Sequence, residues 1–327
     1  MNNQLLLEVK ELKTQFKTER GRVTAVDGIT FHVNEGEIVG IVGESGCGKS
    51  VTSQSILRLF DEKYTASYEG EVLFEGRNLL KESLGGMEDI RGNDIAMIFQ
   101  DPLSSLNPVY TIGYQIAEAV RIHQQVSKKE ARLRAVQMLR LTGIPSPERR
   151  VDEYPHQLSG GMRQRAMIAM ALACRPKLLI ADEPTTALDV TIQAQIMDMI
   201  MELNRELNMG VILITHDLGV VAESCKRVVV MYLGQIVEEA DVQDLFDTPL
   251  HPYTKGLMQS IPHMDGDRSL PLHVIKGSVP SLNNVPKGCR FAARCPYADE
   301  LCLSRMPELS EADNGQKVRC WHYEQIK

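Results

Sequence analysis

The eight residues Gly43–Ser50, GESGCGKS, constrain the fold of this 327-residue chain more than any other stretch. They follow a short apolar run, EIVGIVG (residues 37–43), and lead into KSVTSQSILRLF (residues 49–60), which has helical spacing. A glycine-rich turn between a buried strand and a helix directs backbone N–H groups and the positive end of the helix dipole at one point, where a phosphate fits. The sequence therefore predicts an α/β fold around a phosphate-binding loop.

The residue types inside this loop suit a nucleoside triphosphate. Lys49 is expected to reach the β- and γ-phosphates, and the Ser50 hydroxyl to bind Mg²⁺. Cys47 lies near a helix N-terminus, which can lower a thiol pKa and would make it a redox switch. The interpretation preferred here is that position 47 acts through its backbone. The residues expected to bind ATP in this segment are Gly43, Glu44, Ser45, Gly46, Cys47, Gly48, Lys49, Ser50 and Val51.

A second acidic motif and a second glycine turn follow downstream. The run LLIADEP places Asp182 and Glu183 at the end of an apolar strand, where one carboxylate can hold Mg²⁺ and the next can orient water. The segment LSGGMRQR (residues 158–165) is again a helix start that can grip an anion. Two such helix starts cannot easily serve one nucleotide within one chain. They can if two chains face each other, each completing the other's site.

Five motifs together, GESGCGKS, LSGGMRQR, LLIADEP, TALD and ITHDL, resemble in order and spacing the ATPase subunits of ABC transporters. The resemblance runs from about Leu6 to Ala240. It implies a P-loop ATPase with a parallel-sheet core, an antiparallel β subdomain and a helical signature subdomain. A change of composition near Asp241 adds a small cysteine-rich extension. The expected domains are an ATPase domain at 1–240, with its helical subdomain at about 101–175, and an extension at 241–327.

The resemblance also implies roles for single residues outside the loop. Gln100 would sense the γ-phosphate and join Ser50 and Asp182 at Mg²⁺. Glu183 would be the catalytic base and His216 the switch histidine at the γ-phosphate. Asp189 would be the acid at the dimer interface, and Ser159, Gly160 and Gly161 would grip the ATP of the partner subunit.

The adenine base needs a flat surface to stack on, and the family uses an aromatic residue ahead of the phosphate loop. Phe16 is the best match. Phe31 is an aromatic alternative that could belong to the core, and Val23 is a further candidate for lining the base.

The sequence around Gln100 and the sequence after residue 250 resemble one branch of the family. FQDPLSSLNPVYTIGYQI (residues 99–116) and HPYTKGLMQSIP (residues 251–262) are similar to ATPases of dipeptide and oligopeptide importers, of the D type. Residues 104–108 would then lie near the groove for the coupling helix of a membrane subunit. Importers of nickel or glutathione carry the same motifs and remain alternatives.

Four of the seven cysteines lie in the last 39 residues of the chain: Cys289, Cys295, Cys302 and Cys320. Their spacing resembles an extension that holds a [4Fe–4S] cluster in these importers. By ligand count alone Zn²⁺ is equally suited, and four unrelated thiols are the remaining alternative. A structural staple is preferred over electron transfer, because a short tail with few apolar residues lacks folding energy. Cys174 and Cys225 lie in apolar helical contexts and are expected in the core.

The predicted function is ATP hydrolysis that energises peptide uptake, on the cytoplasmic face of the membrane. The expected partners are a second, paralogous ATPase subunit, two membrane permease subunits and, indirectly, an extracytoplasmic peptide-binding protein. The net charge of −7 argues against a nucleic-acid partner. The rival functions are a non-transport ABC ATPase and a cluster-based redox regulator that binds nucleotide without needing Glu183.

Overall fold

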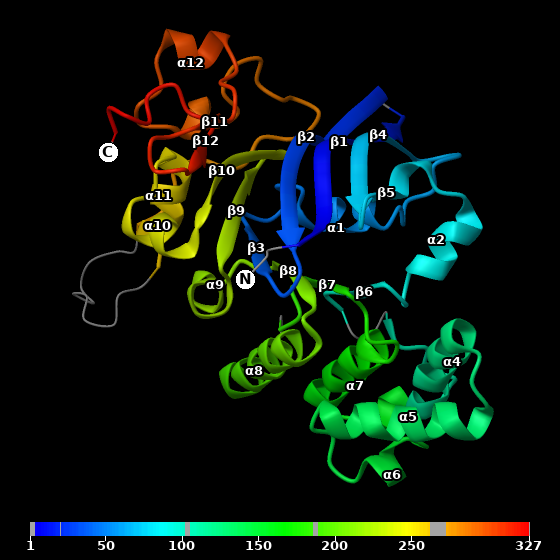
Figure 1. The fold of residues 1–327 in the computed structure, drawn as a ribbon. Helices are drawn as coiled ribbons and strands as arrows, with labels where there is room; N and C mark the ends of the chain where they lie inside the picture. Colours follow the sequence, from blue (N-terminus) through cyan, green and yellow to red (C-terminus); the bar gives the residue numbers. More distant parts are fainter. Residues whose placement is uncertain (1–3, 20, 102–104, 186–188, 262–272, 327) are drawn as a thin grey trace. The chain divides into compact units, whose positions relative to one another are not determined.

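The computed structural model describes residues 4–19, 21–101, 105–185, 189–261 and 273–326 (Figure 1). It divides into two compact units that alternate along the chain. The first unit comprises residues 1–6, 33–38 and 81–214. The second comprises residues 7–32, 39–80 and 215–327. Each unit is described by itself. The expected domain boundary near residue 240 stays a prediction. The two units are made of segments that alternate along the chain, so they do not test a boundary at a single position.

The second unit carries an antiparallel four-stranded sheet in the order β2-β1-β4-β5 (Figure 1). The two long strands have alternating apolar residues, so one face of each is buried while the other remains accessible. The strands of this sheet are β1 (Leu5–Thr18) and β2 (Gly21–Asn34), which are the two long ones, and β4 (Ala66–Phe74) and β5 (Arg77–Asn78).

The same unit contains the strand that leads into the phosphate loop. β3 (Ile38–Val42) runs parallel to β9 (Arg227–Tyr232), and both are buried along their whole length. β9 then pairs with β10 (Gln235–Asp241) across a tight turn. Leu233 and Gly234 in this turn have φ of 44° and 79°, the left-handed pair that a two-residue hairpin favours. The apolar run at 227–240 is therefore a hairpin.

Three α-helices and a short hairpin follow β10 among the described residues of the second unit. Glu238 in β10 is fully buried, and its carboxylate accepts hydrogen bonds from the backbone N–H groups of Leu250 and His251. This contact anchors the extension to the strand. The remaining elements of the unit are α1 (Lys49–Ile56), α9 (Leu218–Ser224), α10 (Val242–Asp247), α11 (Pro252–Gln259), α12 (Glu300–Ser304), β11 (Ser310–Glu311) and β12 (Lys317–Val318), with short 3-10 turns at Leu79–Lys81 and Ala292–Arg294.

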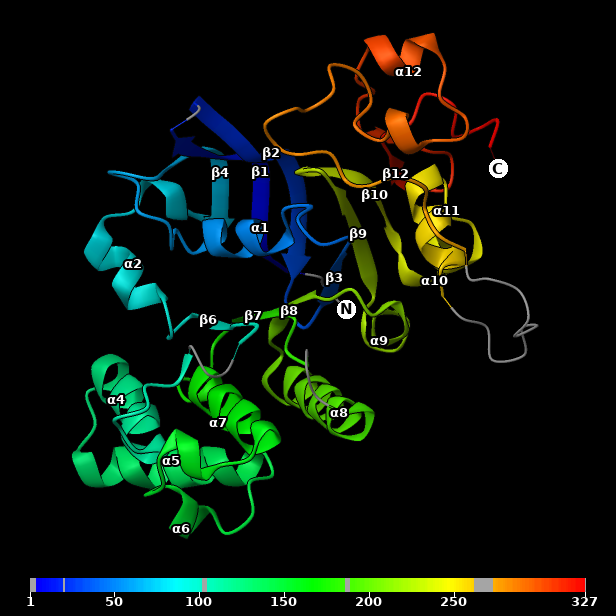
Figure 2. The same ribbon diagram turned by 180° about the vertical axis from the view of Figure 1, so that it is seen from behind.

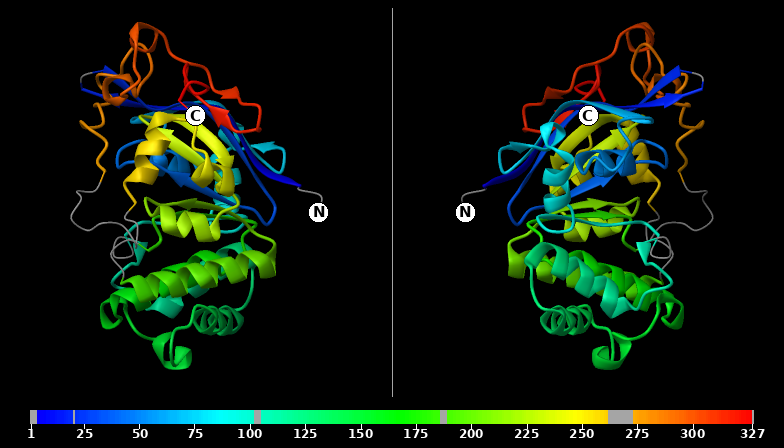
Figure 3. Two further views of the ribbon diagram at one scale, coloured as in Figure 1. Left: turned by 90° about the vertical axis from the view of Figure 1, so that its left-hand side faces the viewer. Right: turned by 90° about the vertical axis from the view of Figure 1, so that its right-hand side faces the viewer.

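The first unit combines a parallel sheet with a group of helices. Its strands β8, β7 and β6 are continuous apolar runs, as a parallel sheet covered on both faces requires. Helices α4, α5 and α7 pack together, seen from behind in Figure 2 and from the side in Figure 3. The elements are α2 (Leu84–Ile90), β6 (Ile95–Ile98), α4 (Ile112–Gln124), α5 (Lys128–Leu141), α6 (Pro147–Arg150), a 3-10 turn at Pro155–Gln157, α7 (Gly160–Leu172), β7 (Leu178–Asp182), α8 (Val190–Leu207) and β8 (Gly210–Ile214).

Side-chain caps define the starts of these helices. Thr111, Ser127 and Ser159 each accept a hydrogen bond from a backbone N–H in the first turn of α4, α5 and α7. In α5 the donor to the Ser127 hydroxyl is the Glu130 N–H, at 3.2 Å. None of the helices in the described residues is long and apolar enough to cross a membrane.

Candidate active site

Glycine shapes the phosphate loop in the second unit. Gly43 and Gly48 have φ of 148° and 105°, which L side chains rarely adopt. A Cβ on Gly43 would lie 2.2 Å from the Met231 carbonyl oxygen, and one on Gly48 would lie 2.8 Å from that of Ala25. The loop is thus folded against neighbouring backbone. Around Gly46 the space within 4 Å is open, so the curl forms a cradle that a phosphate can enter.

Lys49 opens helix α1 and is buried, with 6% of its surface exposed. Its ammonium group donates to the carbonyl oxygens of Gly43 at 2.7 Å and Glu44 at 3.1 Å. The cation is therefore held within the loop, where it can be redirected to an incoming phosphate. The donor set fits a nucleoside triphosphate: a cradle of backbone N–H groups, one lysine and the Ser50 hydroxyl.

Cys47 is 1% exposed, and burial raises the pKa of its thiol. A raised pKa keeps the thiol protonated and unreactive at neutral pH. This supports the interpretation that position 47 acts through its backbone and does not serve as a redox switch.

Phe16 and Val23 line one open hollow of about 650 Å³ in the second unit, together with Thr18, Glu19, Ser281, Leu282 and Asn283. The Phe16 ring also meets Phe60 edge to face, with centroids 4.8 Å apart. Phe31, the aromatic alternative, is 2% exposed and belongs to the core. Residues 281–283, from the C-terminal extension, are part of this wall and were not anticipated from the sequence.

In the first unit, β7 carries Asp182 to its end, buried to 3% exposure. The next residue, Glu183, turns away with φ of 48°. A left-handed backbone at a glutamate is uncommon and is held here by the Glu183 N–H, which donates to the Ile214 carbonyl at 2.9 Å. Gln100, which follows β6, donates from Nε2 to Glu183 Oε2 at 2.9 Å. The structure thus brings together Gln100 and Glu183.

The helix start after Leu158 is exposed at Ser159 and Gly160. The Ser159 hydroxyl caps α7, and a Cβ added to Gly160 would meet nothing within 4 Å. This open turn is accessible to a partner molecule. Asp189 is also exposed, and its carboxylate caps α8 by accepting the Ile192 N–H at 3.0 Å. Residues 186–188 of the TALD motif, Ser104 and Pro262 lie outside the described residues.

His216 lies in the second unit just after Thr215 and is exposed. Thr215 accepts the Asp217 N–H, and Asp217 in turn caps α9. These two turns fix the backbone on either side of the histidine. Its expected role at the γ-phosphate stays a prediction.

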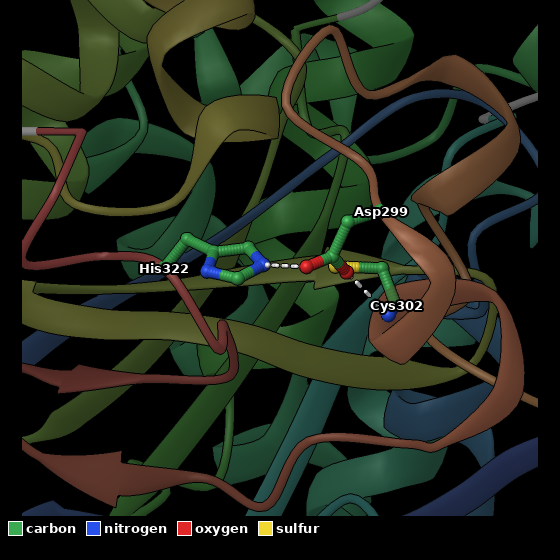
Figure 4. Close-up of side chains that lie close together, drawn as sticks. All are labelled: Asp299, Cys302 and His322. Atoms are coloured by element: carbon green, nitrogen blue, oxygen red, sulfur yellow. Dashed lines mark hydrogen bonds and ion pairs between the residues drawn. The ribbon is translucent and has the colours of Figure 1, made fainter.

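The four C-terminal cysteines line one small cavity in the second unit. Burial raises the pKa of each of these thiols, and that of Cys320 rises to about 11. Asp299 accepts the Cys302 N–H at 2.9 Å and lies 3.0 Å from His322 Nε2 (Figure 4). In the described part of the chain, the group of metal-capable donor atoms within 4.8 Å of one another is Asp299, Cys302 and His322.

Cys174 and Cys225 are buried as expected for core thiols, at 6% and 7% exposure. Burial raises the pKa of Cys225 to about 12. Its sulfur lies 3.0 Å from where a Cβ on Gly40 would stand, which explains the glycine in the middle of β3.

Comparison with protein families gives two matches. The family described as ABC transporter matches residues 26–186, and the one described as oligopeptide/dipeptide transporter, C-terminal region, matches residues 237–302. A probable peptide ABC transporter ATP-binding protein of Sinorhizobium fredii is 57% identical, over 98% of this chain and 96% of its own length. An oligopeptide transport ATP-binding protein of Bacillus subtilis is 53% identical, over 98% and 97%.

Solved structures with a similar fold are cassettes of ABC transporters. A bacterial cassette solved as a dimer is 29% identical, with a TM-score of 0.65 over 72% of this chain and 99% of that one. The post-hydrolysis dimer of the same cassette, bound to ADP and phosphate, gives 0.66 over the same shares. The predicted cassette fold and the predicted family are confirmed.

The prediction of a [4Fe–4S] cluster is corrected. Within the described residues, the metal-capable donor atoms that lie within 4.8 Å of one another come from one aspartate, one cysteine and one histidine, and not from the four cysteines. Asp299 Oδ2 lies 3.0 Å from His322 Nε2 and forms an ion pair with it when the imidazole is protonated. The relatives and the C-terminal family are described by ATP binding and peptide transport alone.

Proposed function

Because this chain belongs to the ATP-binding proteins of peptide ABC transporters, we propose that it hydrolyses ATP to energise the uptake of dipeptides and oligopeptides. The observation that carries this proposal is the pairing of a phosphate loop at 43–50 with a C-terminal region of the oligopeptide/dipeptide type. The nickel and glutathione alternatives share the loop. The names of the two relatives cited above refer to peptide and oligopeptide transport.

The proposed binding step uses the second unit. The cradle of residues 43–50 receives the phosphates, Lys49 turns its ammonium to the β- and γ-phosphates, and Phe16 stacks on the adenine. Mg²⁺, when bound, neutralises charge on the phosphates. Oxygen donors suited to this hard cation are Ser50, Gln100 and Asp182.

The proposed hydrolytic step uses Glu183 as the base. Its carboxylate accepts a proton from water and directs the water at the γ-phosphate, while Gln100 holds the carboxylate in place through the 2.9 Å hydrogen bond. His216 is proposed to contact the γ-phosphate. An imidazole N–H can donate a hydrogen bond to a phosphate oxygen.

The exposed helix start at Ser159–Gly161 is proposed to close the ATP site of a facing ATPase subunit. Its open surroundings support this, since an anion can approach the turn without moving a side chain. Asp189 is proposed to lie at the same interface. We propose a paralogous ATPase as the facing subunit and two permease subunits at the membrane. They receive peptide from an extracytoplasmic binding protein, with this chain peripheral on the cytoplasmic side.

Peptide uptake in a strain lacking this chain tests the proposal. Labelled trialanine, ⁶³Ni²⁺ and labelled glutathione are offered to the deletion strain and to strains complemented with the wild-type chain or with Lys49→Ala. The expected result is that only trialanine uptake depends on the chain and that Lys49→Ala fails to restore it. Loss of nickel or glutathione uptake instead would replace peptide as the cargo. Full uptake with Lys49→Ala would contradict the role of the loop.

A further inference from the structure

Three groups of Glu44, the second residue of the phosphate loop, are bonded within the second unit. Its carbonyl accepts from Lys49 inside the loop. Its other two polar groups bind side chains from the C-terminal extension, Tyr253 and Arg294. The loop is therefore bonded to residues more than 200 positions away along the chain.

The first of these bonds joins the Glu44 backbone to Tyr253. The Glu44 N–H donates to the Tyr253 hydroxyl oxygen at 2.7 Å. Tyr253 lies at the start of α11 and is fully buried, and its ring packs on Tyr232 and Phe291 with centroids 4.8 Å and 5.4 Å away. Such packing fixes the position of the hydroxyl, so the acceptor is rigid.

The second bond is a paired contact between Arg294 and the Glu44 carboxylate. Nη1 donates to Oε2 at 2.6 Å and Nη2 to Oε1 at 3.0 Å, the two-fold geometry that makes such pairs strong and directional. The Arg294 side chain is 4% exposed and that of Glu44 29%. Water therefore screens the arginine end of the pair poorly.

Arg294 is itself held from the extension side. Its Nε donates to the Lys276 carbonyl at 3.0 Å, and its guanidinium lies 5.8 Å from the ring centroids of both Tyr232 and Phe291. A lysine could not reproduce this, because its single ammonium lacks the planar fork.

We propose that Arg294 and Tyr253 are positioning residues for ATP binding, which hold the phosphate loop in its receptive shape through Glu44. The ligand is the triphosphate of ATP, and the extension acts on it through the loop alone. Without the contacts of Arg294 and Tyr253, residues 43–46 gain backbone freedom. ATP binding is then weakened by the conformational entropy that is lost when these residues become ordered. The effect falls on ATP affinity and leaves the chemical step unchanged. The inference rests on the proposed role of the loop as the ATP site.

The test measures the Kd of a fluorescent ATP analogue and the KM and kcat for ATP in the full-length chain. Arg294→Ala is expected to raise Kd and KM about tenfold, with kcat at saturating ATP within about twofold of wild type. Arg294→Lys and Tyr253→Phe are expected to give smaller rises. The control is Arg305→Ala, another arginine of the extension, whose guanidinium lies over Trp321. It is expected to bind as wild type.

A double-mutant cycle separates this role from general damage. If Arg294 acts through Glu44, the Glu44→Ala, Arg294→Ala double variant binds ATP no more weakly than the weaker single variant. Additive losses would overturn the inference, as would wild-type affinity in Arg294→Ala. If Arg294→Ala does not fold, as thermal melting shows, the cycle is run with Glu44→Gln and Arg294→Lys, under the same criterion.

Lys49→Ala distinguishes the two proposals. If it abolishes binding while Arg294→Ala leaves affinity unchanged, the loop is the ATP site and the positioning inference alone fails. If Lys49→Ala binds ATP as wild type, the proposed site itself fails.

Discussion

Gln100 and Glu183, 83 residues apart, are joined by a hydrogen bond of 2.9 Å from Nε2 to Oε2. One residue follows β6 and the other follows β7, two neighbouring parallel strands of the first unit. Strands that run parallel end at the same edge of a sheet, where phosphate-handling groups collect in α/β proteins. The pair therefore places an amide beside a candidate base.

Glu183→Gln is expected to abolish ATP turnover and to keep ATP binding. The amide is isosteric and can still meet Gln100, yet it cannot accept a proton from water. Steady-state phosphate release, expected to fall by about 100-fold or more, and the Kd of a fluorescent ATP analogue check this. Turnover at the wild-type rate would remove Glu183 from the mechanism and favour a nucleotide-binding regulator.

Gly160→Glu is expected to abolish ATP-dependent dimerisation and turnover while leaving the fold intact. A Cβ added at this exposed position would meet nothing within 4 Å, so the free energy of unfolding should change by about 1 kcal/mol or less. The new carboxylate repels the phosphates of a facing subunit. Size-exclusion chromatography with Glu183→Gln as background and a phosphate-release assay check the two losses.

Gly85→Glu is the matched control for that substitution. Gly85 lies in helix α2 of the same unit, and a Cβ there also meets nothing within 4 Å. Equal loss of activity in both variants would show that the effect is not specific to the turn at 159–161.

Phe16→Ala is expected to weaken ATP binding by about fivefold or more, because stacking of a base on an aromatic ring contributes roughly 1–3 kcal/mol. The triphosphate part of the ligand should be unaffected, so inorganic triphosphate is expected to compete equally well in the variant and in wild type. Tyr64→Ala, which removes a 64% exposed aromatic ring that is not among the residues lining the hollow, is the control. An unchanged Kd for ATP in Phe16→Ala would place the adenine elsewhere.

His251→Asn is expected to reduce the loss of stability on acidification. Burial lowers the pKa of His251 to about 3, with the nearby Arg319 cation acting in the same direction. Below its unfolded pKa of about 6.5 the unfolded chain binds a proton that the folded chain refuses, so this residue costs stability as pH falls from 6.5 toward 3. The slope from one such group is at most about 1.4 kcal/mol per pH unit.

Asparagine at position 251 keeps an acceptor for the Tyr253 N–H, which His251 Nδ1 now binds at 3.1 Å, and it does not titrate. Buried Glu238 faces the same residue, and burial raises the pKa of its carboxyl. The stability contributed by Glu238 is therefore lost as pH rises, which is opposite to the effect of His251. Urea unfolding at pH 7.0 and 5.5 checks the prediction. An equal pH dependence in both proteins would contradict it.

The cassette fold was predictable because its determinants are local. Gly43 and Gly48 are needed by backbone conformation alone, and Ser127 and Ser159 cap their helices from within one turn. The apolar runs of β3, β7 and β8 are short and continuous, as buried parallel strands must be. Such signals lie within a few residues of their effect, so they can be read along the chain.

Contacts between segments that are distant in the sequence could not be predicted from it. Arg294 and Glu44 are 250 residues apart, and no periodicity links them. The left-handed backbone at Glu183 is imposed by its bond to Ile214 and has no signal in the residue type. The cysteine spacing led to the wrong prediction of a [4Fe–4S] cluster, because spacing does not reveal that Asp299 and His322 lie beside Cys302.

The hydrogen bonds to Glu44 also imply an order of events during the synthesis and folding of the chain. Residues 43–50 leave the ribosome early, while Tyr253 and Arg294 follow only when most of the chain has been synthesised. On the inference above, the loop reaches its receptive shape only once the extension has folded onto it. Tight nucleotide binding then becomes a property of the finished chain, and a nascent or truncated subunit is expected to bind ATP more weakly than the complete one.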